Sequence, residues 1–382
     1  MDKKLWINGF AEFHARFHDL FRRGDSRLQS SKYVRGLLSP VERKNGWQIA
    51  EITGNDVPDP TQRLLYRTQW DQDAARDILQ DYIAEKLGAP DGIGILDETG
   101  FIKKGKSSAG VQRQYTGTAG KIENCQIGVF LAYATKHGHS LLDRQLYIPE
   151  AWCNDAARRK RARIPESVEF QTKPQLAMEM LNHAFSRDIP LQWITGDEVY
   201  GNSSELREML QKRGKFYVLA VRSNMLVRPD SHCEPTTVAV MAASLRPNQW
   251  KRISVGRGEK GERLYDWAAV RMLEKRNDTW QEGWLLIRRS IDDPGELAYY
   301  LSNAAKDIRL KQLAIIAATR FRIEQCFEEA KGETGLDHYE ARLWQCWYRH
   351  ITLSMMAHAF LVVMRATAGG KKNLRWNQPW QN

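Results

Sequence analysis

The chain has 382 residues, of which 42% are hydrophobic and 27% are charged. This composition is typical of a globular protein of two or three domains and excludes a disordered or fibrous chain. The 57 Lys and Arg residues outnumber the 46 Asp and Glu residues, and the net charge of +11 favours a polyanionic partner, most simply nucleic acid. The five scattered cysteines argue for a reducing compartment and against a zinc module. The longest apolar run, 351–364, is too short to span a bilayer.

Residues 1–88 are predicted to form an N-terminal helical domain. The phenylalanines that mark its first apolar face recur at three- and four-residue spacing: Phe10, Phe13, Phe17 and Phe21. Asp71 is the predicted N-cap of a helix that ends before Gly88. Charge and position favour DNA contact by this domain, with a purely packing role as the alternative.

Residues 89–221 contain two apolar strands that each end in an aspartate. Gly92–Leu96 precedes Asp97, and Leu191–Gly196 precedes Asp197. Strand alternation places Asp97 on the face opposite Glu98, and Thr99-Gly100 is a turn signal. An Asp in this position is either a turn residue or a site residue.

Basic side chains follow these strands in two tracts, and either tract could be a solvated charge run or a grip on DNA phosphates. The candidate DNA-binding residues are Lys103, Lys104, Lys106 and Arg113 in the first tract and Arg158, Arg159, Lys160 and Arg161 in the second.

Residues 222–302 alternate short strand-like runs with turns, which predicts a β-rich insertion. It contains several Trp residues among arginines, a combination that can stack bases and bind phosphates. Most of these Trp residues are expected in the core, with Trp267 and Trp284 as candidates for stacking an extruded base.

Residues 303–366 are predicted to be helical, and a basic tail follows at 367–382. Helical spacing places Glu324 on one face with Arg320 one turn before it and Lys331 further along. Such pairs are usually structural. Glu324 gains weight because Asp97 and Asp197 supply two more carboxylates from separate elements, and three carboxylates are a plausible two-metal site for phosphoryl transfer.

Three short sequence blocks contain these carboxylates and follow one another along the chain. They are Asp97-Glu98-Thr99-Gly100, Gly196-Asp197-Glu198-Val199-Tyr200-Gly201 and Arg320-x3-Glu324-x6-Lys331. Together they resemble the blocks of bacterial insertion-sequence transposases of the DDE class. More narrowly, nearly the whole chain resembles the IS-four-like superfamily and, within it, the IS-seven-oh-one group. One position departs from the pattern, because Ala317 stands where relatives usually have a Tyr three residues before the Arg.

The resemblance implies an α/β fold with an RNase H-like catalytic core, a mixed five-stranded sheet with helices on both faces. It implies that Asp97, Asp197 and Glu324 are catalytic and hold two Mg²⁺ ions, for which Mn²⁺ can substitute. Arg320 and Lys331 would contact the DNA backbone near the scissile phosphate.

The implied function is cut-and-paste DNA transposition: metal-dependent cleavage at the element ends and strand transfer of the 3′-OH into target DNA, with a hairpin intermediate as one route. The implied partners are double-stranded DNA, comprising the terminal inverted repeats and the target, and a second copy of the chain on that DNA. The implied location is the bacterial cytoplasm, at the nucleoid. A catalytically silent DNA-binding relative such as a repressor, an RNase H-like nuclease without strand transfer, and purely structural carboxylates are the alternatives.

Overall fold

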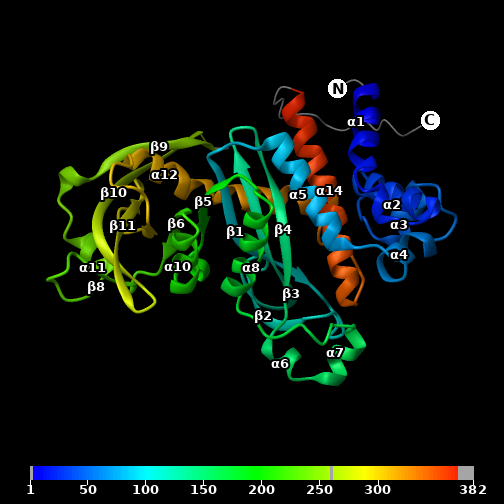
Figure 1. The fold of residues 1–382 in the computed structure, drawn as a ribbon, viewed down its shortest axis with the longest axis horizontal. Helices are drawn as coiled ribbons and strands as arrows, with labels where there is room; N and C mark the ends of the chain where they lie inside the picture. The colour runs from blue at the N-terminus through cyan, green and yellow to red at the C-terminus, as the bar shows by residue number, and fades with distance from the viewer. Residues whose placement is uncertain (1–2, 259–260, 369–382) are drawn as a thin grey trace.

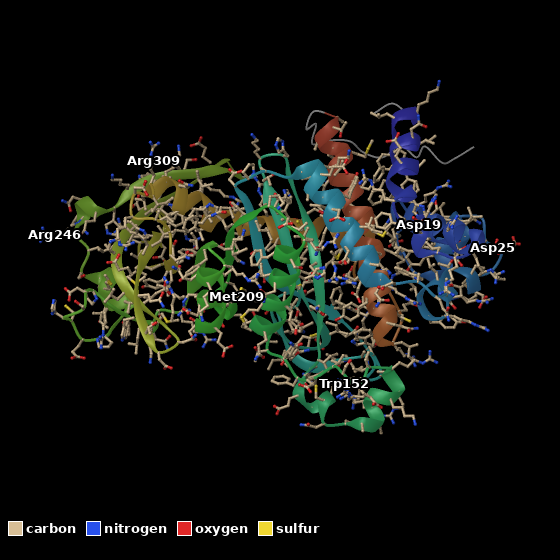
Figure 2. All side chains as sticks on the ribbon, viewed as in Figure 1. Asp19, Asp25, Trp152, Met209, Arg246 and Arg309 are labelled. Atoms are coloured by element: carbon tan, nitrogen blue, oxygen red, sulfur yellow. The ribbon has the colours of Figure 1, made fainter. Side chains whose placement is uncertain are left out.

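The structure is a computed structural model that describes residues 3–258 and 261–368. Figure 1 shows an elongated molecule with the N-terminal helices at one end, a sheet with packed helices in the middle and a β-rich part at the other end, and Figure 2 adds the side chains in the same view. The mixed α/β fold confirms the predicted fold class. The predicted basic tail lies outside the described residues from position 369 onward.

Helices precede the first strand, as the spacing of apolar residues predicts. They are α1 (Lys3–Ala15), the 3₁₀ turn η1 (His18–Leu20), α2 (Gly24–Leu37), α3 (Gly46–Ile52), α4 (Asp59–Tyr66) and α5 (Gln72–Leu87). All four spaced phenylalanines of the first segment are buried. Asp71 caps α5 by accepting hydrogen bonds from the backbone N–H groups of Asp73 (2.8 Å) and Ala74 (3.0 Å), which confirms its predicted role.

The middle of the molecule is a mixed sheet with short helices between its strands. Its elements are β1 (Gly92–Ile102), β2 (Gln112–Thr116), β3 (Lys121–Thr135), β4 (Gly138–Tyr147), α6 (Glu150–Cys153), α7 (Ala156–Ala162), α8 (Lys173–Ser186), β5 (Leu191–Gly196), α9 (Glu198–Gly201), α10 (Ser204–Lys212) and β6 (Phe216–Val221). The strand order β4-β3-β1-β5-β6 gives the expected five-stranded core, in which β3 runs antiparallel to β1 whereas β5 and β6 run parallel to it.

The β-rich part continues the central sheet instead of forming a sheet of its own. Its elements are β7 (Leu226–Arg228), β8 (Thr236–Thr237), α11 (Val238–Ala243), the 3₁₀ turn η2 (Pro247–Gln249), β9 (Lys251–Gly258), β10 (Gly261–Arg276), β11 (Thr279–Arg289) and β12 (Leu297–Ser302). Strand β12 pairs antiparallel with β6, so the described residues form a 12-stranded sheet that crosses the predicted boundary at 221/222. The expectation of five strands therefore covers only the central part.

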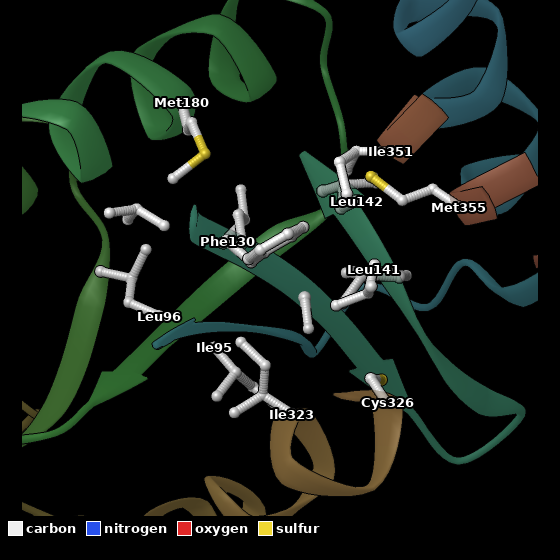
Figure 3. Packing of buried hydrophobic residues seen from close by; sticks show 14 of the residues in the cluster. Ile95, Leu96, Phe130, Leu141, Leu142, Met180, Ile323, Cys326, Ile351 and Met355 are labelled. Carbon is white, nitrogen blue, oxygen red and sulfur yellow. The ribbon is translucent and has the colours of Figure 1, made fainter. Parts of the chain in front are cut away.

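Three helices follow the sheet: α12 (Leu310–Thr319), α13 (Phe321–Thr334) and α14 (Trp344–Thr367). In Figure 3, Met180 of α8 lies on the side of Leu96, whereas Ile323 of α13 lies beside Ile95, so successive β1 residues face different helices. Helix α14 is buried from Cys346 to Met364 and packs along the edge strand β4. These helices fix α13 against the face of β1 that carries the odd-numbered residues.

Candidate active site

The register of the parallel strands brings Asp97 and Asp197 together. The pairing of β1 with β5 ends at Leu96 and Gly196, which are direct partners. Each aspartate is the next residue along the chain, within β1 for Asp97 and directly after β5 for Asp197, so the two carboxylates start from neighbouring positions. Strand β1 itself does not end here: it continues to Ile102 on its other neighbour, β3. The predicted turn at Thr99-Gly100 is therefore wrong.

Asp197 is held by the helix that follows it. It is the N-cap of α9, and its Oδ1 accepts a hydrogen bond from the backbone N–H of Val199 at 2.9 Å. The other carboxylate oxygen is not used by this cap.

Glu324 reaches the same place from α13. Arg320 joins it to Asp97, because its Nη1 lies 3.3 Å from Asp97 Oδ2 and its Nη2 lies 2.8 Å from Glu324 Oε1. Arg320 is also the residue at which α12 ends and α13 begins, so the predicted single helix is interrupted there. The Asp97 side chain is only 14% exposed, whereas that of Glu324 is 46% exposed.

The electrostatics show an excess of negative charge at Asp97. Burial and then the neighbouring Asp197 carboxylate raise the pKa of Asp97 to about 7, although Arg320 acts in the opposite direction. Burial, followed by the charge of Glu98, raises the pKa of Asp197 as well. A site that leaves two carboxylates short of counter-charge has room for additional cations.

The carboxylate oxygens of this site are suitable ligands for divalent cations, and the Arg320 guanidinium lies among them. Carboxylate oxygens from three elements are the ligands that Mg²⁺ prefers. Within the described ranges, no three Asp, Glu, His or Cys side chains are arranged to hold an ion as they stand. The guanidinium of Arg320 lies between Asp97 and Glu324 instead, so it is the positive charge that a metal ion would replace.

A polar network behind Asp97 was missed by the sequence analysis. Glu98 points to the other face of β1, as alternation predicts, and there its Oε2 accepts a hydrogen bond from the Tyr200 hydroxyl at 2.8 Å. Its Oε1 lies 2.5 Å from Lys173 Nζ at the start of α8. Tyr200 belongs to α9, the helix capped by Asp197, so this network fastens the Asp197 turn to β1. The sequence indicates this contact only by the position of Tyr200, three residues after Asp197.

The candidate DNA-binding cations divide into two groups. Exposed side chains belong to Lys104, Lys106, Arg113, Lys160 and Arg161. The others are engaged within the protein. Lys103 donates to the Tyr339 carbonyl (3.0 Å), and burial lowers its pKa to about 8. Arg159 donates to the carbonyls of Pro165 and Val168, both at 2.7 Å.

Arg158 and Lys331 also act as structural ties. Arg158 stacks over the Trp152 ring at 3.8 Å and donates to the Val111 carbonyl at 3.0 Å. Lys331 Nζ donates to Thr99 Oγ1 at 2.9 Å, on the same face of β1 as Asp97. Both side chains are therefore engaged within the protein, and their contact with DNA stays a prediction.

The two tryptophans proposed for base stacking have different surroundings. Trp267 is 1% exposed in a second core cluster with Tyr300, so it cannot stack an extruded base without leaving that cluster. Trp284 is half-buried, and Arg271 covers its ring at 4.9 Å. Ala317, which replaces the usual Tyr, is buried in the same cluster. The structure therefore argues against Trp267 in that role.

Comparisons with known proteins support the family and the fold. The model of a family described as DDE superfamily endonuclease matches residues 16–284, which include Asp97 and Asp197 and end before Glu324. The probable transposase for insertion sequence element IS701 of Microchaete diplosiphon is 25% identical over 326 residues, covering 82% of this chain and 78% of that protein. The structure of the piggyBac transposase synaptic complex with hairpin DNA aligns with 93% of this chain and 68% of that chain, at a TM-score of 0.50 and 10% identity.

A mixed sheet with carboxylates gathered at its centre defines the RNase H-like class of nucleases, and the likeness to the piggyBac structure supports that fold. The chain belongs to the DDE superfamily endonucleases. The predicted identity as a DDE-class insertion-sequence transposase, and hence as an enzyme, is confirmed. Nucleases of this superfamily generally use divalent metal ions. Among the described residues, no helix has the length and apolar character to cross a bilayer.

Proposed function

We propose that Asp97, Asp197 and Glu324 are the catalytic carboxylates of this transposase and that they hold two Mg²⁺ ions, or Mn²⁺ in their place. One observation carries the proposal: the guanidinium of Arg320 lies 3.3 Å from Asp97 Oδ2 and 2.8 Å from Glu324 Oε1. Carboxylates from β1 and α13 thus share one positive charge, and the register of β1 with β5 places Asp197 beside Asp97.

The reaction follows from the charge of the substrate. A phosphodiester repels an anionic nucleophile, and bound divalent cations would lower the pKa of the attacking oxygen and stabilise the leaving 3′ oxygen. Water attacks first at the element end and releases a 3′-OH, which then attacks target DNA in the same site. The carboxylates position these groups, and Glu98 with Tyr200 holds the Asp197 turn in place.

The DNA substrate lies, in this proposal, over the exposed cations of the loop after β1, of β2 and of α7. Lys104, Lys106, Arg113, Lys160 and Arg161 bind backbone phosphates, which position the duplex without reading its sequence. Arg320 moves from Asp97 and Glu324 to a phosphate oxygen when metal binds. Strand transfer of two element ends into one target requires two active sites, so the working form is a homodimer on DNA.

The experiment that tests the proposal uses a labelled duplex carrying the end of the chain's own element together with its flank. Purified protein is incubated with and without Mg²⁺, beside Asp97→Asn and Glu324→Gln variants. Glu328→Gln is the matched control, because Glu328 is an exposed carboxylate one turn further along α13.

We expect metal-dependent nicking at the element boundary that both active-site variants lose by at least 100-fold while still binding the duplex. The control should cleave normally. Joining of the cut end to a target plasmid then separates a transposase from a nuclease that stops after cleavage. Binding without cleavage by the unmodified protein in both Mg²⁺ and Mn²⁺ would instead support a catalytically silent DNA-binding protein.

A further inference from the structure

The hairpin formed by β2 and β3 folds back over β1. Thr116 packs directly against Gly100, where an added Cβ would lie 1.9 Å from Thr116 Oγ1. At the hairpin tip, Thr118 Oγ1 donates to the Gly100 carbonyl at 3.2 Å and accepts from the Gly100 N–H at 3.3 Å. The hairpin is thus attached to β1 by its tip as well as by its strands.

Lys331 ties this tip to the catalytic helix. Its ammonium donates to Thr118 Oγ1 at 3.2 Å and to Thr99 Oγ1 at 2.9 Å. Because strand residues two apart point the same way, Thr99 lies next to Asp97 on the same face of β1, roughly 7 Å along the strand. The hairpin tip is therefore fastened to β1 at Thr99 and Gly100, two and three residues beyond Asp97, while Thr116 packs against the face of β1 opposite Asp97.

The outward face of the hairpin exposes two apolar side chains side by side. Tyr115 is 66% exposed and Ile122 is 58% exposed, and they are direct partners in the β2–β3 register. Buried Thr116 is on the opposite face, against β1. Single exposed apolar residues are ordinary on protein surfaces. A Tyr and an Ile exposed side by side on one hairpin face instead form a small apolar patch that can bind a partner.

Cations lie beside this pair. Arg113 precedes Tyr115 by two residues on the same face and is exposed. Its partner in the register, Asn124, donates through Nδ2 to the Gly105 carbonyl at 3.0 Å and so places the loop of Lys104 and Lys106 along the hairpin.

Helix α7 packs against the same loop, which adds its basic tract to this end of the molecule. Arg158 Nη2 donates to the Lys106 carbonyl at 3.2 Å. The acidic neighbour Glu123 belongs to the other face of the hairpin, where Lys121 lies 3.7 Å from it. We call the face made by Lys104, Lys106, Arg113, Tyr115 and Ile122 the hairpin surface.

We propose that the hairpin surface docks on the DNA duplex beside the scissile phosphate, with Tyr115 and Ile122 wedged into the minor groove at one base step. The inference rests on the proposed function, since the substrate must lie over Asp97. The three cations can bind phosphates on either side of the groove, and apolar side chains inserted at a base step partly unstack and bend the duplex. A second copy of this surface is a poorer partner, because two identical positive faces repel each other.

The test measures DNA distortion without cleavage. An element-end duplex with 2-aminopurine at successive positions around the boundary is mixed with protein in metal-free buffer, and fluorescence and affinity are recorded. The variants are Tyr115→Ala, Tyr115→Phe and the double variant Tyr115→Ala/Ile122→Ala. Val240→Ala is the matched control, because Val240 is 61% exposed on α11 in the β-rich part of the molecule.

We expect the unmodified protein, Tyr115→Phe and the control to raise the fluorescence of one or two positions at the boundary. Tyr115→Ala and the double variant should lose that rise and bind about 10-fold more weakly, with unchanged thermal unfolding. Arg113→Ala should keep the rise and reduce the salt slope of binding by about one. This readout does not require catalysis, so a protein that fails to cleave still tests the docking surface.

Two results overturn the proposal. The first is a fluorescence rise and an affinity in Tyr115→Ala that equal those of the unmodified protein. The second is a normal rise in the double variant together with a loss of self-association in the absence of DNA, because that result assigns the hairpin surface to a protein interface.

Discussion

At the scale of single residues, the charge that the proposal requires of Asp97 is opposed by the surroundings of its carboxyl group. The proposed mechanism needs its carboxyl group as an anion, yet burial and Asp197 raise its pKa from 3.8 to about 7. Between these values the folded chain holds a proton that the unfolded chain has released. Stability therefore falls as the pH rises from about 4 to about 7, and the penalty is complete above pH 7.

Replacing this carboxylate should stabilise the fold. Because Asn cannot ionise, Asp97→Asn should raise the free energy of unfolding in metal-free buffer, and the gain at pH 8 should exceed that at pH 5 by about 2–3 kcal/mol. Urea unfolding at both pH values measures it. An equal effect at the two pH values would mean that Asp97 ionises normally.

Arg320 should compete with metal ions for the same oxygens. In Arg320→Ala, a cation approaching Asp97 and Glu324 no longer meets a guanidinium, so Mn²⁺ should bind about 5-fold more tightly at pH 8. Arg322→Ala is the control, since Arg322 is exposed and donates to Gln325 on the outside of α13. Titration calorimetry without DNA gives the affinities. Weaker Mn²⁺ binding in Arg320→Ala would show that the guanidinium organises the site instead of occupying it.

At the scale of elements, Gly100 decides how closely the β2–β3 hairpin approaches the active site. An added methyl group would lie 2.8 Å from Thr116 Cβ, so Gly100→Ala must push the hairpin away from β1. We expect a loss of about 1–3 kcal/mol in stability, and a larger relative loss in cleavage at the element boundary. Gly105→Ala, in open space on the neighbouring loop, should change neither. Normal cleavage by Gly100→Ala would separate the hairpin position from catalysis.

Gly100 also shows where sequence patterns reached their limit. Alternation correctly placed Asp97 and Glu98 on opposite faces, and the Arg320 and Glu324 spacing correctly predicted their contact. Thr99-Gly100 predicted a turn, but the glycine allows a hairpin to cross the strand, and no local pattern encodes which segment crosses.

The net charge likewise predicted a basic surface, but it did not indicate which Lys and Arg side chains are exposed on that surface. Exposed Lys104 and half-buried Lys103 are neighbours in one lysine-rich loop, and only tertiary packing against Tyr339 distinguishes them. The contact of Glu98 with Tyr200 joins distant parts of the chain in the same way. Such contacts depend on which strands and helices pack together. The spacing of apolar residues in one sequence does not determine that packing.

At the scale of the whole molecule, the β-rich part and the catalytic core share one sheet and one buried ionic cluster. Glu274 of β10 is fully buried and pairs with Arg207 of α10 at 2.7 Å and with Arg276 at 2.6 Å. It also accepts a hydrogen bond from the Tyr217 hydroxyl of β6. One carboxylate therefore connects a core helix, a core strand and the longest strand of the predicted insertion.

Removing its charge should uncouple the two parts. Glu274→Gln leaves two buried guanidinium groups without a carboxylate, which should cost about 3–5 kcal/mol. The cost belongs to the contact between the parts, so calorimetry should show one unfolding transition splitting into two, with the β-rich part unfolding first. Glu282→Gln, at an exposed pair with Arg271 on the adjacent strand, should leave a single transition almost unmoved. If Glu274→Gln lowers one transition without splitting it, sheet continuity through β6 and β12 suffices to keep the molecule one cooperative unit.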